Sequence, residues 1–194
     1  MQVFELKGEV RSDLGKKSTK ALRIEERIPC VLYGGKENFH FSVVERDLAK
    51  LLYTPNVYTV KLDIGGKAYN AVIKDIQFHP VTDKVLHMDF YQIFEDKAVV
   101  MEVPVKLQGF SVGVQAGGKL ALIMRKLKVK ALPANLPGEL VLDVTSLGLG
   151  KSIKVKDLSF DNFEIANAKE VVVAQIKMTR AAKSNEAAAD TGKK

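Results

Sequence analysis

A basic segment near the N-terminus carries residues that could bind phosphate. Positions 11–23 hold five basic side chains against a single acidic one, Asp13. The basic residues are Arg11, Lys16, Lys17, Lys20 and Arg23. Gly15, Ser18 and Thr19 lie between them, and such hydroxyls and backbone amides beside lysine and arginine suit a phosphate-rich polymer better than a single small anion. The segment therefore indicates a nucleic-acid partner, although these charges could also do no more than solvate an exposed loop.

Two predicted strands joined by a short connection carry a second group of polar side chains. Alternation along the first strand places Asp75, Gln77 and His79 on one face. In the second strand His87 and Asp89 share a face, with apolar residues behind them. The short connection makes the two strands antiparallel neighbours. Amide, imidazole and carboxylate groups on a rigid sheet can read base edges, and the wide, shallow minor groove of RNA exposes such edges.

These polar side chains have two other interpretations. They could be only the solvated face of the sheet. Alternatively, His79, His87 and Asp89 could form a metal or acid–base site, because two of them share a face and the third comes from the adjacent strand. Against that site, the chain has no His-Glu-x-x-His, paired-cysteine or Walker-type spacing.

Two shorter features allow both a structural and a nucleic-acid interpretation. Tyr33, which precedes Gly34 and Gly35, could stack on a base or ribose, or it could close the end of a core. The segment 119–130 contains basic residues and no acidic ones, and its lysines alternate with apolar residues as in a strand with one solvated face. We expect that face to be solvated, with a second RNA or protein contact as the alternative.

The composition predicts a folded, intracellular protein. The 194 residues are 46% hydrophobic, which supports real cores, and the net charge of +7 favours a polyanionic partner. The single cysteine, Cys30, excludes an internal disulfide framework and is expected to be a buried small hydrophobe. The N-terminal residues lack the pattern of a signal peptide, and no apolar run approaches the ~20 residues that span a bilayer. We therefore expect a cytoplasmic protein with no membrane partner.

The elements that must position these residues are mainly strands. In the first part of the chain we predict strands over 3–10, 29–33, 39–44, 57–64, 67–78 and 85–94. Glycine pairs at 34–35 and 65–66 predict tight turns. Two helices are predicted, one over 19–27 capped by Ser18 and one over 45–53.

The second part of the chain predicts another all-β domain. Its expected strands are 98–107, 119–132, 139–147, 152–158 and 169–177, with a glycine-rich loop at 109–118. The fold class is therefore mainly β, with a small N-terminal antiparallel barrel and two short helices in residues 1–94. A second all-β domain covers 95–177, and a disordered tail covers 178–194.

Three blocks of sequence resemble a known family. The runs LGKKSTKALR with IPCVLYGG, DIQFHPVTDKVLHMDF, and LPANLPGELVLDVTSLGLGKSIKVKDL are similar to the bacterial large-subunit ribosomal protein twenty-five family, in its long two-domain form of the general stress protein CTC type. The resemblance covers residues 1–177. It implies a ribosomal, non-enzymatic protein whose N-terminal barrel, similar to the anticodon-binding barrel of glutaminyl-tRNA synthetase, binds the loop E minor groove of 5S rRNA.

The resemblance also implies which residues contact RNA. Carried over position by position, they are Arg11, Lys16, Thr19, Lys20, Arg23, Tyr33, Gln77, His87 and Asp89. Two departures from the family pattern are the acids at 25 and 26 after the first helix, and Ala21 where some members carry arginine. The implied partners are 5S rRNA and neighbouring large-subunit components, with no metal, cofactor, small-molecule substrate or catalytic residue. The alternatives are a metal-assisted enzyme using His79, His87 and Asp89, or a tRNA-directed module without a synthetase catalytic domain.

Overall fold

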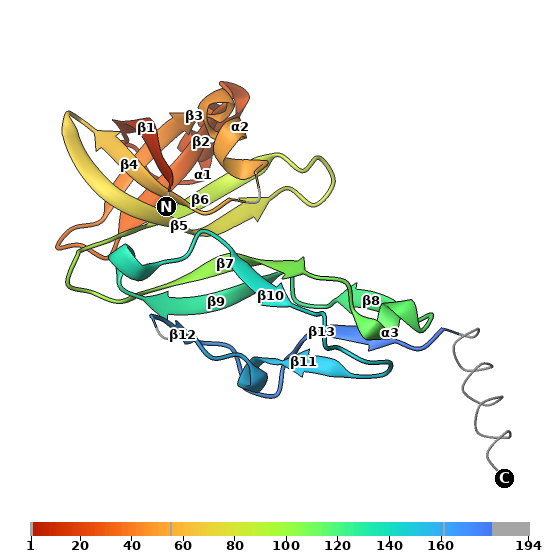
Figure 1. Cartoon of the computed structure of the whole chain (residues 1–194). Helices are drawn as coiled ribbons and strands as arrows, with labels where there is room; N and C mark the ends of the chain where they lie inside the picture. The colour runs from red at the N-terminus through yellow and green to blue at the C-terminus, as the bar shows by residue number, and fades with distance from the viewer. Residues whose placement is uncertain (1, 55, 161, 180–194) are drawn as a thin grey trace, which may run out of the picture. The chain divides into compact units, whose positions relative to one another are not determined.

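The computed structural model describes residues 2–54, 56–160 and 162–179 (Figure 1). The chain divides into two compact units. The first comprises residues 1–101 together with 132–138, and the second comprises 102–131 together with 139–194. The tail predicted over 178–194 lies outside the described residues from position 180 onward.

The first unit is built on a closed six-stranded barrel, which confirms the predicted barrel. Its strands are β1 (Gln2–Val10), β2 (Arg27–Tyr33), β3 (Phe39–Val44), β4 (Tyr58–Ile64), β5 (Lys67–Phe78) and β6 (Val85–Gln92). They follow the order β1-β3-β2-β6-β5-β4 around the barrel. Among these strands β1 pairs with β4, and β2 with β6, in parallel, so the barrel is mixed and not purely antiparallel as predicted. Strands joined by a hairpin must run antiparallel, but these two pairs are far apart in the chain and no turn fixes their direction.

Alternating side chains fill the barrel. In β4, Val60, Leu62 and Ile64 are buried, and the residues between them are exposed. The rings of Phe41 and Phe90 pack together with centroids 5.7 Å apart. Cys30 is 1% exposed, and burial raises the pKa of its thiol, which confirms it as a small core residue and not a nucleophile.

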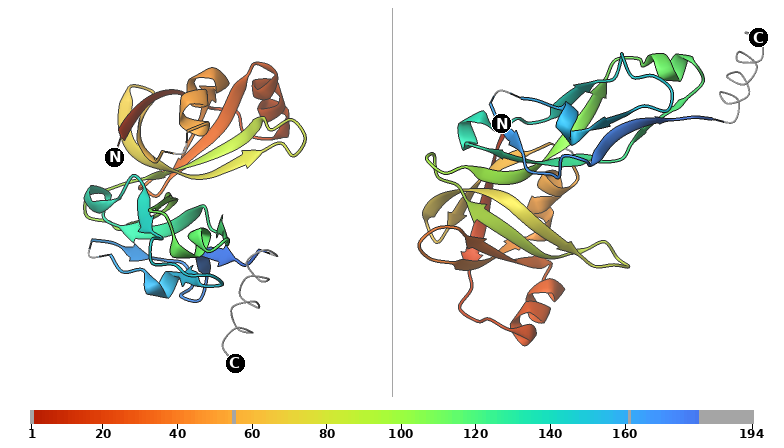
Figure 2. Two further views of the ribbon diagram at one scale, coloured as in Figure 1. Left: turned by 45° about the vertical axis from the view of Figure 1, so that its right-hand side comes forward. Right: turned by 90° about the horizontal axis from the view of Figure 1, so that it is seen from below.

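Two helices lie on the outside of the barrel, α1 (Lys16–Ile24) and α2 (Glu45–Leu52) (Figure 2). The start of α2 agrees with the prediction, but α1 begins and ends three residues earlier than predicted. It starts after Gly15, whose φ of 126° suits glycine, and Ser18 does not cap it. It stops before Glu26, which has a φ of 56°, and the chain then enters β2. None of the helices within the described residues is both long and apolar enough to cross a membrane.

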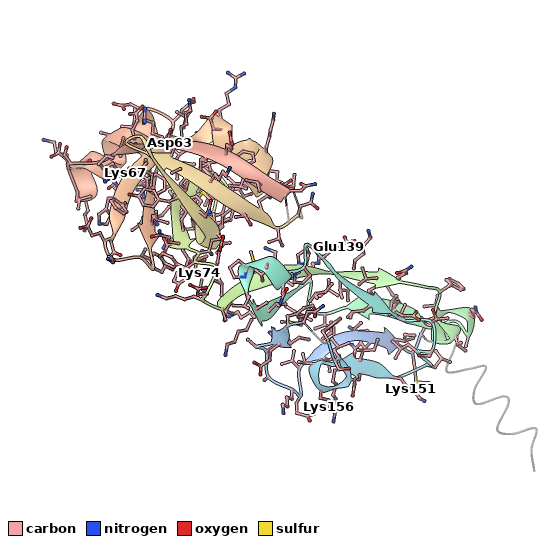
Figure 3. The ribbon with its side chains drawn as sticks, turned by 60° about the vertical axis from the view of Figure 1, so that its left-hand side comes forward. Asp63, Lys67, Lys74, Glu139, Lys151 and Lys156 are labelled. Carbon is pink, nitrogen blue, oxygen red and sulfur yellow. The ribbon has the colours of Figure 1, made fainter. Side chains whose placement is uncertain are left out.

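The β4–β5 hairpin follows the prediction closely. Gly65 and Gly66 both have positive φ, as a two-residue turn of this kind requires. Asp63 accepts a hydrogen bond from the amide of Gly66 at 3.2 Å, and it lies with Lys67 at the turn (Figure 3). Lys74, further along β5, donates to the carbonyl of Val100 at 3.0 Å.

The described part of the second unit contains two sheets. One has the order β10-β7-β9-β12, and the other has the order β11-β13-β8. The strands are β7 (Val99–Gln108), β8 (Lys119–Leu122), β9 (Lys126–Ala131), β10 (Leu140–Asp143), β11 (Ser152–Lys154), β12 (Glu164–Ile165) and β13 (Val172–Lys177). The β character is as predicted, and in β9 the buried Leu127 and Val129 alternate with exposed lysines as expected.

Local structure in this unit departs from the prediction at several points, and β12 was not predicted as a strand. The single strand predicted over 119–132 is two strands in different sheets. The amides of Ile123 and Met124 both donate to the carbonyl of Val173 in β13, and the chain then enters the other sheet as β9 at Lys126. The glycine-rich loop holds a short helix, α3 (Val112–Gln115), whose Val114 amide donates to the hydroxyl of Ser111. The strand predicted over 152–158 continues as a 3-10 turn, η2 (Val155–Asp157). A second such turn, η1 (Pro133–Asn135), belongs to the part of the first unit that covers residues 132–138.

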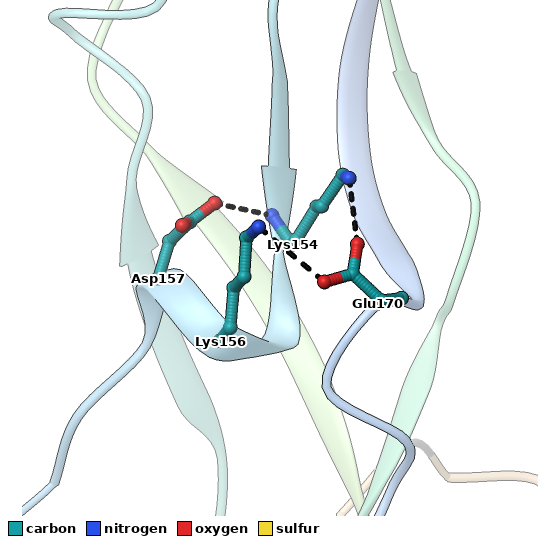
Figure 4. A network of polar contacts seen from close by, with 4 residues as sticks. All are labelled: Lys154, Lys156, Asp157 and Glu170. Carbon is teal, nitrogen blue, oxygen red and sulfur yellow. Dashed lines mark hydrogen bonds and ion pairs between the residues drawn. The ribbon is translucent and has the colours of Figure 1, made fainter.

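A small ionic network fixes the start of η2 (Figure 4). The carboxylate of Glu170 accepts from the ammonium groups of Lys154 at 2.8 Å and Lys156 at 3.4 Å. The carboxylate of Asp157 accepts from the backbone amide of Lys154 at 2.9 Å. The hydrogen bonds from Lys154 and then Lys156 hold the pKa of Glu170 below its ordinary value. The hydrogen bond between Lys154 and Glu170 also raises the pKa of Lys154.

We expect Lys154→Met to raise the pKa of Glu170 towards its ordinary value, measured by NMR titration of the side-chain carboxyl. Because that pKa is lowered by folding, the network contributes stability above the ordinary glutamate pKa and loses it as the pH falls through the lowered one. Lys151→Met is the control, since Lys151 is exposed and contributes no side chain to this network. Equal titration of Glu170 in both variants would contradict the assignment.

Candidate nucleic-acid interface

The structure brings the predicted polar face together on β5 and β6. Gln77 lies directly opposite His87, and Asp75 lies opposite Asp89, in the antiparallel register of these strands. The pairing shifts around Lys74, where a β-bulge adds a residue to β5. The apolar residues between them, such as Met88, are buried, so the polar side chains project from the outer face of the barrel.

Strand β2 adds Tyr33 to the same face. In its parallel pairing with β6, Tyr33 lies beside Tyr91, and their rings meet edge to face with centroids 5.7 Å apart. Gly34 leaves room for this ring, because a Cβ there would lie 2.7 Å from Tyr91. Burial, followed by the charges of Asp89 and Asp75, raises the pKa of Tyr33, so its phenol stays protonated and can donate at neutral pH.

His87 and Asp89 form a linked pair. Nδ1 of His87 lies 2.8 Å from Oδ1 of Asp89, and both side chains are 29% exposed. Nδ1 is the nitrogen that donates to Asp89, and Nε2 has no hydrogen bond to any described residue. The second carboxylate oxygen of Asp89 has no hydrogen bond to any described residue, so it can accept one from outside.

His79 does not join that pair. Its Nδ1 accepts hydrogen bonds from the backbone amides of Val81 at 3.3 Å and Thr82 at 3.2 Å, which closes the turn between β5 and β6. Within the described residues no three His, Cys, Asp or Glu side chains are grouped so as to hold a metal ion. The structure therefore does not bring His79 together with His87 and Asp89, the three residues of the alternative metal site.

The loop before α1 is ordered by its own side chains. Arg11 donates from Nη2 to the carbonyl of Asp13 at 3.2 Å and to the hydroxyl of Ser18 at 3.5 Å. Ser18 in turn donates to the carbonyl of Asp13 at 3.0 Å. Thr19 donates its hydroxyl proton to the carbonyl of Gly15 at 2.7 Å, so it offers an outside partner only an acceptor. Some of the hydrogen-bonding groups of Arg11 and Thr19 are therefore already used within the protein.

The lysine side chains of α1 are free to contact an outside partner. Lys16, Lys17 and Lys20 are exposed, and none of them forms a hydrogen bond or ion pair from its side chain within the described part of the chain. Lys16, Lys20 and Arg23 are spaced four and three residues apart, so they share one side of the helix. Arg23 donates from Nε and Nη2 to the carbonyl of Leu86 in β6, at 3.2 and 3.0 Å. The positive side of α1 is therefore tied to the strand that carries His87.

Two residues on this face were not among the predicted RNA contacts. Asp75 and Tyr91 lie beside Asp89 and Tyr33 in register. Alternation along the strands already places Asp75 with Gln77 and Tyr91 with His87, so the signal was present in the sequence. The family resemblance did not include them.

Comparison with known proteins decides the family. The model of the "Ribosomal L25p family" matches residues 6–90, and that of "Ribosomal protein TL5, C-terminal domain" matches residues 98–180. The chain belongs to the ribosomal L25p family. A protein of Phocaeicola vulgatus named "Large ribosomal subunit protein bL25" is 56% identical over all of both chains. Proteins of the same name from Bacteroides fragilis and Porphyromonas gingivalis are 53% and 50% identical, over 97% and 94% of this chain and 99% and 96% of their own.

Membership of the L25p family confirms two expectations. The chain is of the long two-domain type, because both family models match it in succession. It is a structural ribosomal protein and not an enzyme, so the alternative of a metal-assisted enzyme is excluded.

Proposed function

We propose that the N-terminal domain of this L25p family member, residues 1–94, binds 5S rRNA at the loop E minor groove. The observation that carries the proposal is the juxtaposition of two unlike surfaces on one side of the barrel. Exposed lysines lie along α1, and a face of amide, imidazole and carboxylate groups lies along β5 and β6. Phosphate contacts fix position on an RNA, and contacts to base edges supply specificity.

Each group has a distinct task. Lys16 and Lys20 neutralise phosphates, and the unused oxygen of Asp89 accepts from a base amino group exposed in the minor groove. Gln77 and Nε2 of His87 contact base edges or 2′-hydroxyls. Tyr33, fixed against Tyr91, packs on a sugar. A widened minor groove suits this face because a β-sheet is too broad for a narrow one.

The remaining partners follow from the assignment. The second domain, residues 95–177, would contact neighbouring components of the large subunit in the cytoplasmic ribosome. The N-terminal interface needs no cofactor, metal ion or small-molecule substrate, because its chemistry is hydrogen bonding and charge. A tRNA-directed role for the barrel would show itself as competition by tRNA for the 5S rRNA complex.

The test is binding of the full chain to 5S rRNA and to a size-matched structured RNA over a range of salt concentrations. We expect tight binding to 5S rRNA that survives at physiological salt, and weak binding to the second RNA that salt removes. Equal and steeply salt-dependent binding to both RNAs would show that α1 is only a non-specific cationic patch.

Replacing Lys16 with glutamine should weaken binding to all RNAs alike. Removal of one phosphate contact lowers the slope of log K against log salt by about 0.7–0.9, because fewer counterions are released. The ratio of affinities for 5S rRNA and the control RNA should stay unchanged. Lys61→Gln is the matched control, since Lys61 is an exposed lysine on β4, away from this face. A change in the affinity ratio, or an equal effect of Lys61→Gln, would argue against a phosphate contact by Lys16.

A further inference from the structure

Helix α1 has little to hold it in place by itself. It has nine residues, and none of its side chains, all of which are described, is fully buried. No side chain caps its N-terminus, and its first turn contains lysines and no acid, which opposes the helix dipole. Helices shorter than about 12–15 residues are marginal in water without packing. The position and order of α1 must therefore depend on specific contacts with the barrel.

Arg23 makes the contact that reaches β6. Two of its donors, Nε and Nη2, bond to the same carbonyl, that of Leu86, at 3.2 and 3.0 Å. The pairing of β2 with β6 begins at Met88, so this carbonyl lies beyond the ladder on that side. Arg23 therefore donates to a β6 carbonyl that the β2–β6 ladder does not reach, although β2 itself extends back to Arg27. An arginine suits this place because its donors are held in a rigid fork, whereas lysine offers a single nitrogen.

We propose that Arg23 is a positioning residue that holds the lysines of α1 at a fixed place beside the base-reading face, and is not itself one of the phosphate contacts. The inference rests on the proposed 5S rRNA function. Leu86 immediately precedes His87, and Lys16 and Lys20 lie on the same side of α1 as Arg23. One side chain therefore sets the spacing between the residues that bind phosphate and those that bind bases.

The experiment compares Arg23→Gln and Arg23→Lys with Lys20→Gln in the full chain. Amide hydrogen exchange is measured in the protein without RNA, and 5S rRNA binding is measured against salt. We expect α1 amides to exchange about tenfold faster in Arg23→Gln, with barrel amides unchanged. Affinity should fall about tenfold, while the slope of log K against log salt changes much less than in Lys20→Gln.

Lys20→Gln is the matched control for a phosphate contact. It should lower the slope by about 0.7–0.9 and leave α1 exchange as in the wild type. Arg23→Lys keeps the charge but not the fork, so α1 should remain loosened.

Two results would overturn the proposal. One is unchanged α1 exchange in Arg23→Gln with a slope reduced as in Lys20→Gln, which would make Arg23 a phosphate contact. The other is wild-type α1 exchange and wild-type 5S rRNA affinity in Arg23→Lys, which would show that the pair of hydrogen bonds from Arg23 is not needed to position α1. If the wild-type protein failed to prefer 5S rRNA while Arg23→Gln still loosened α1, the proposed function would fail and the structural tether would stand.

Discussion

Replacing Phe90 with alanine is expected to destabilise the barrel by about 3–5 kcal/mol, because the truncation leaves a cavity in a packed core. Phe90 is fully buried, packs against Phe41, and lies in β6 between Asp89 and Tyr91. Loss of its side chain removes the anchor that keeps those two residues on the outer face. RNA binding should therefore be lost together with stability.

The chain offers a selective probe for this experiment. All five tyrosines lie between positions 33 and 91, and the chain contains no tryptophan. Tyrosine fluorescence during urea unfolding therefore reports on the barrel alone. Phe78→Ala is the matched control, since Phe78 is 46% exposed at the end of β5 and should change stability by less than about 1 kcal/mol. Similar urea midpoints for the two variants would contradict the assignment of Phe90 to the barrel core.

Replacing Asp89 with alanine is expected to reduce discrimination between 5S rRNA and the control RNA by about 1–3 kcal/mol. The reason is that a base amino group would lose its acceptor inside the interface. The loss should appear in the affinity ratio and leave the salt slope nearly unchanged, which is the reverse of the Lys16→Gln result. Because Asp89 also holds His87 through Nδ1, part of the loss reflects a less ordered imidazole.

Two comparisons isolate the role of Asp89. Asp47→Ala removes an exposed carboxylate from α2, outside the interface, and should leave discrimination as it is. Asp89→Asn keeps one acceptor oxygen and should retain part of the discrimination. If Asp89→Ala discriminated as well as the wild type, the assignment of base reading to this carboxylate would be wrong.

Local patterns predicted most of the barrel, because each depends on neighbours in sequence. The alternation of Val60, Leu62 and Ile64 identifies β4, and the glycines at 65–66 identify its turn. Parallel pairing of β2 with β6 could not be predicted in this way, since it depends on how distant strands meet. The start of α1 was placed wrongly because Ser18 is a good cap in isolation, whereas here its hydroxyl is bonded to Asp13.

In the candidate interface, too, the contacts set by local sequence could be predicted and the contacts between distant residues could not. Gln77, His87 and Asp89 could be placed on one face from the sequence. A hairpin joins their strands, and alternate side chains along a strand point to the same face. The contact between Arg23 and Leu86 joins residues 63 positions apart, and no local pattern signals it. Charge and the family resemblance indicated an RNA contact for Arg23, and the geometry adds a contact within the protein, from its Nε and Nη2 to the carbonyl of Leu86.

The insertion of β6 between β2 and β5 has a consequence for the order of folding during synthesis. The strand order places the last strand of the barrel next to an early one, so the sheet cannot close until residue 92 has been made. The proposed base-reading face lies on β5 and β6, and α1 is joined to β6 through Arg23. A nascent chain that ends before β6 has the lysines but no arrangement that could recognise one RNA among many. Closure of a barrel by strands far apart in the chain is slow compared with helix formation. We therefore expect the chain to become able to bind its RNA only at the late step in which β6 closes the barrel.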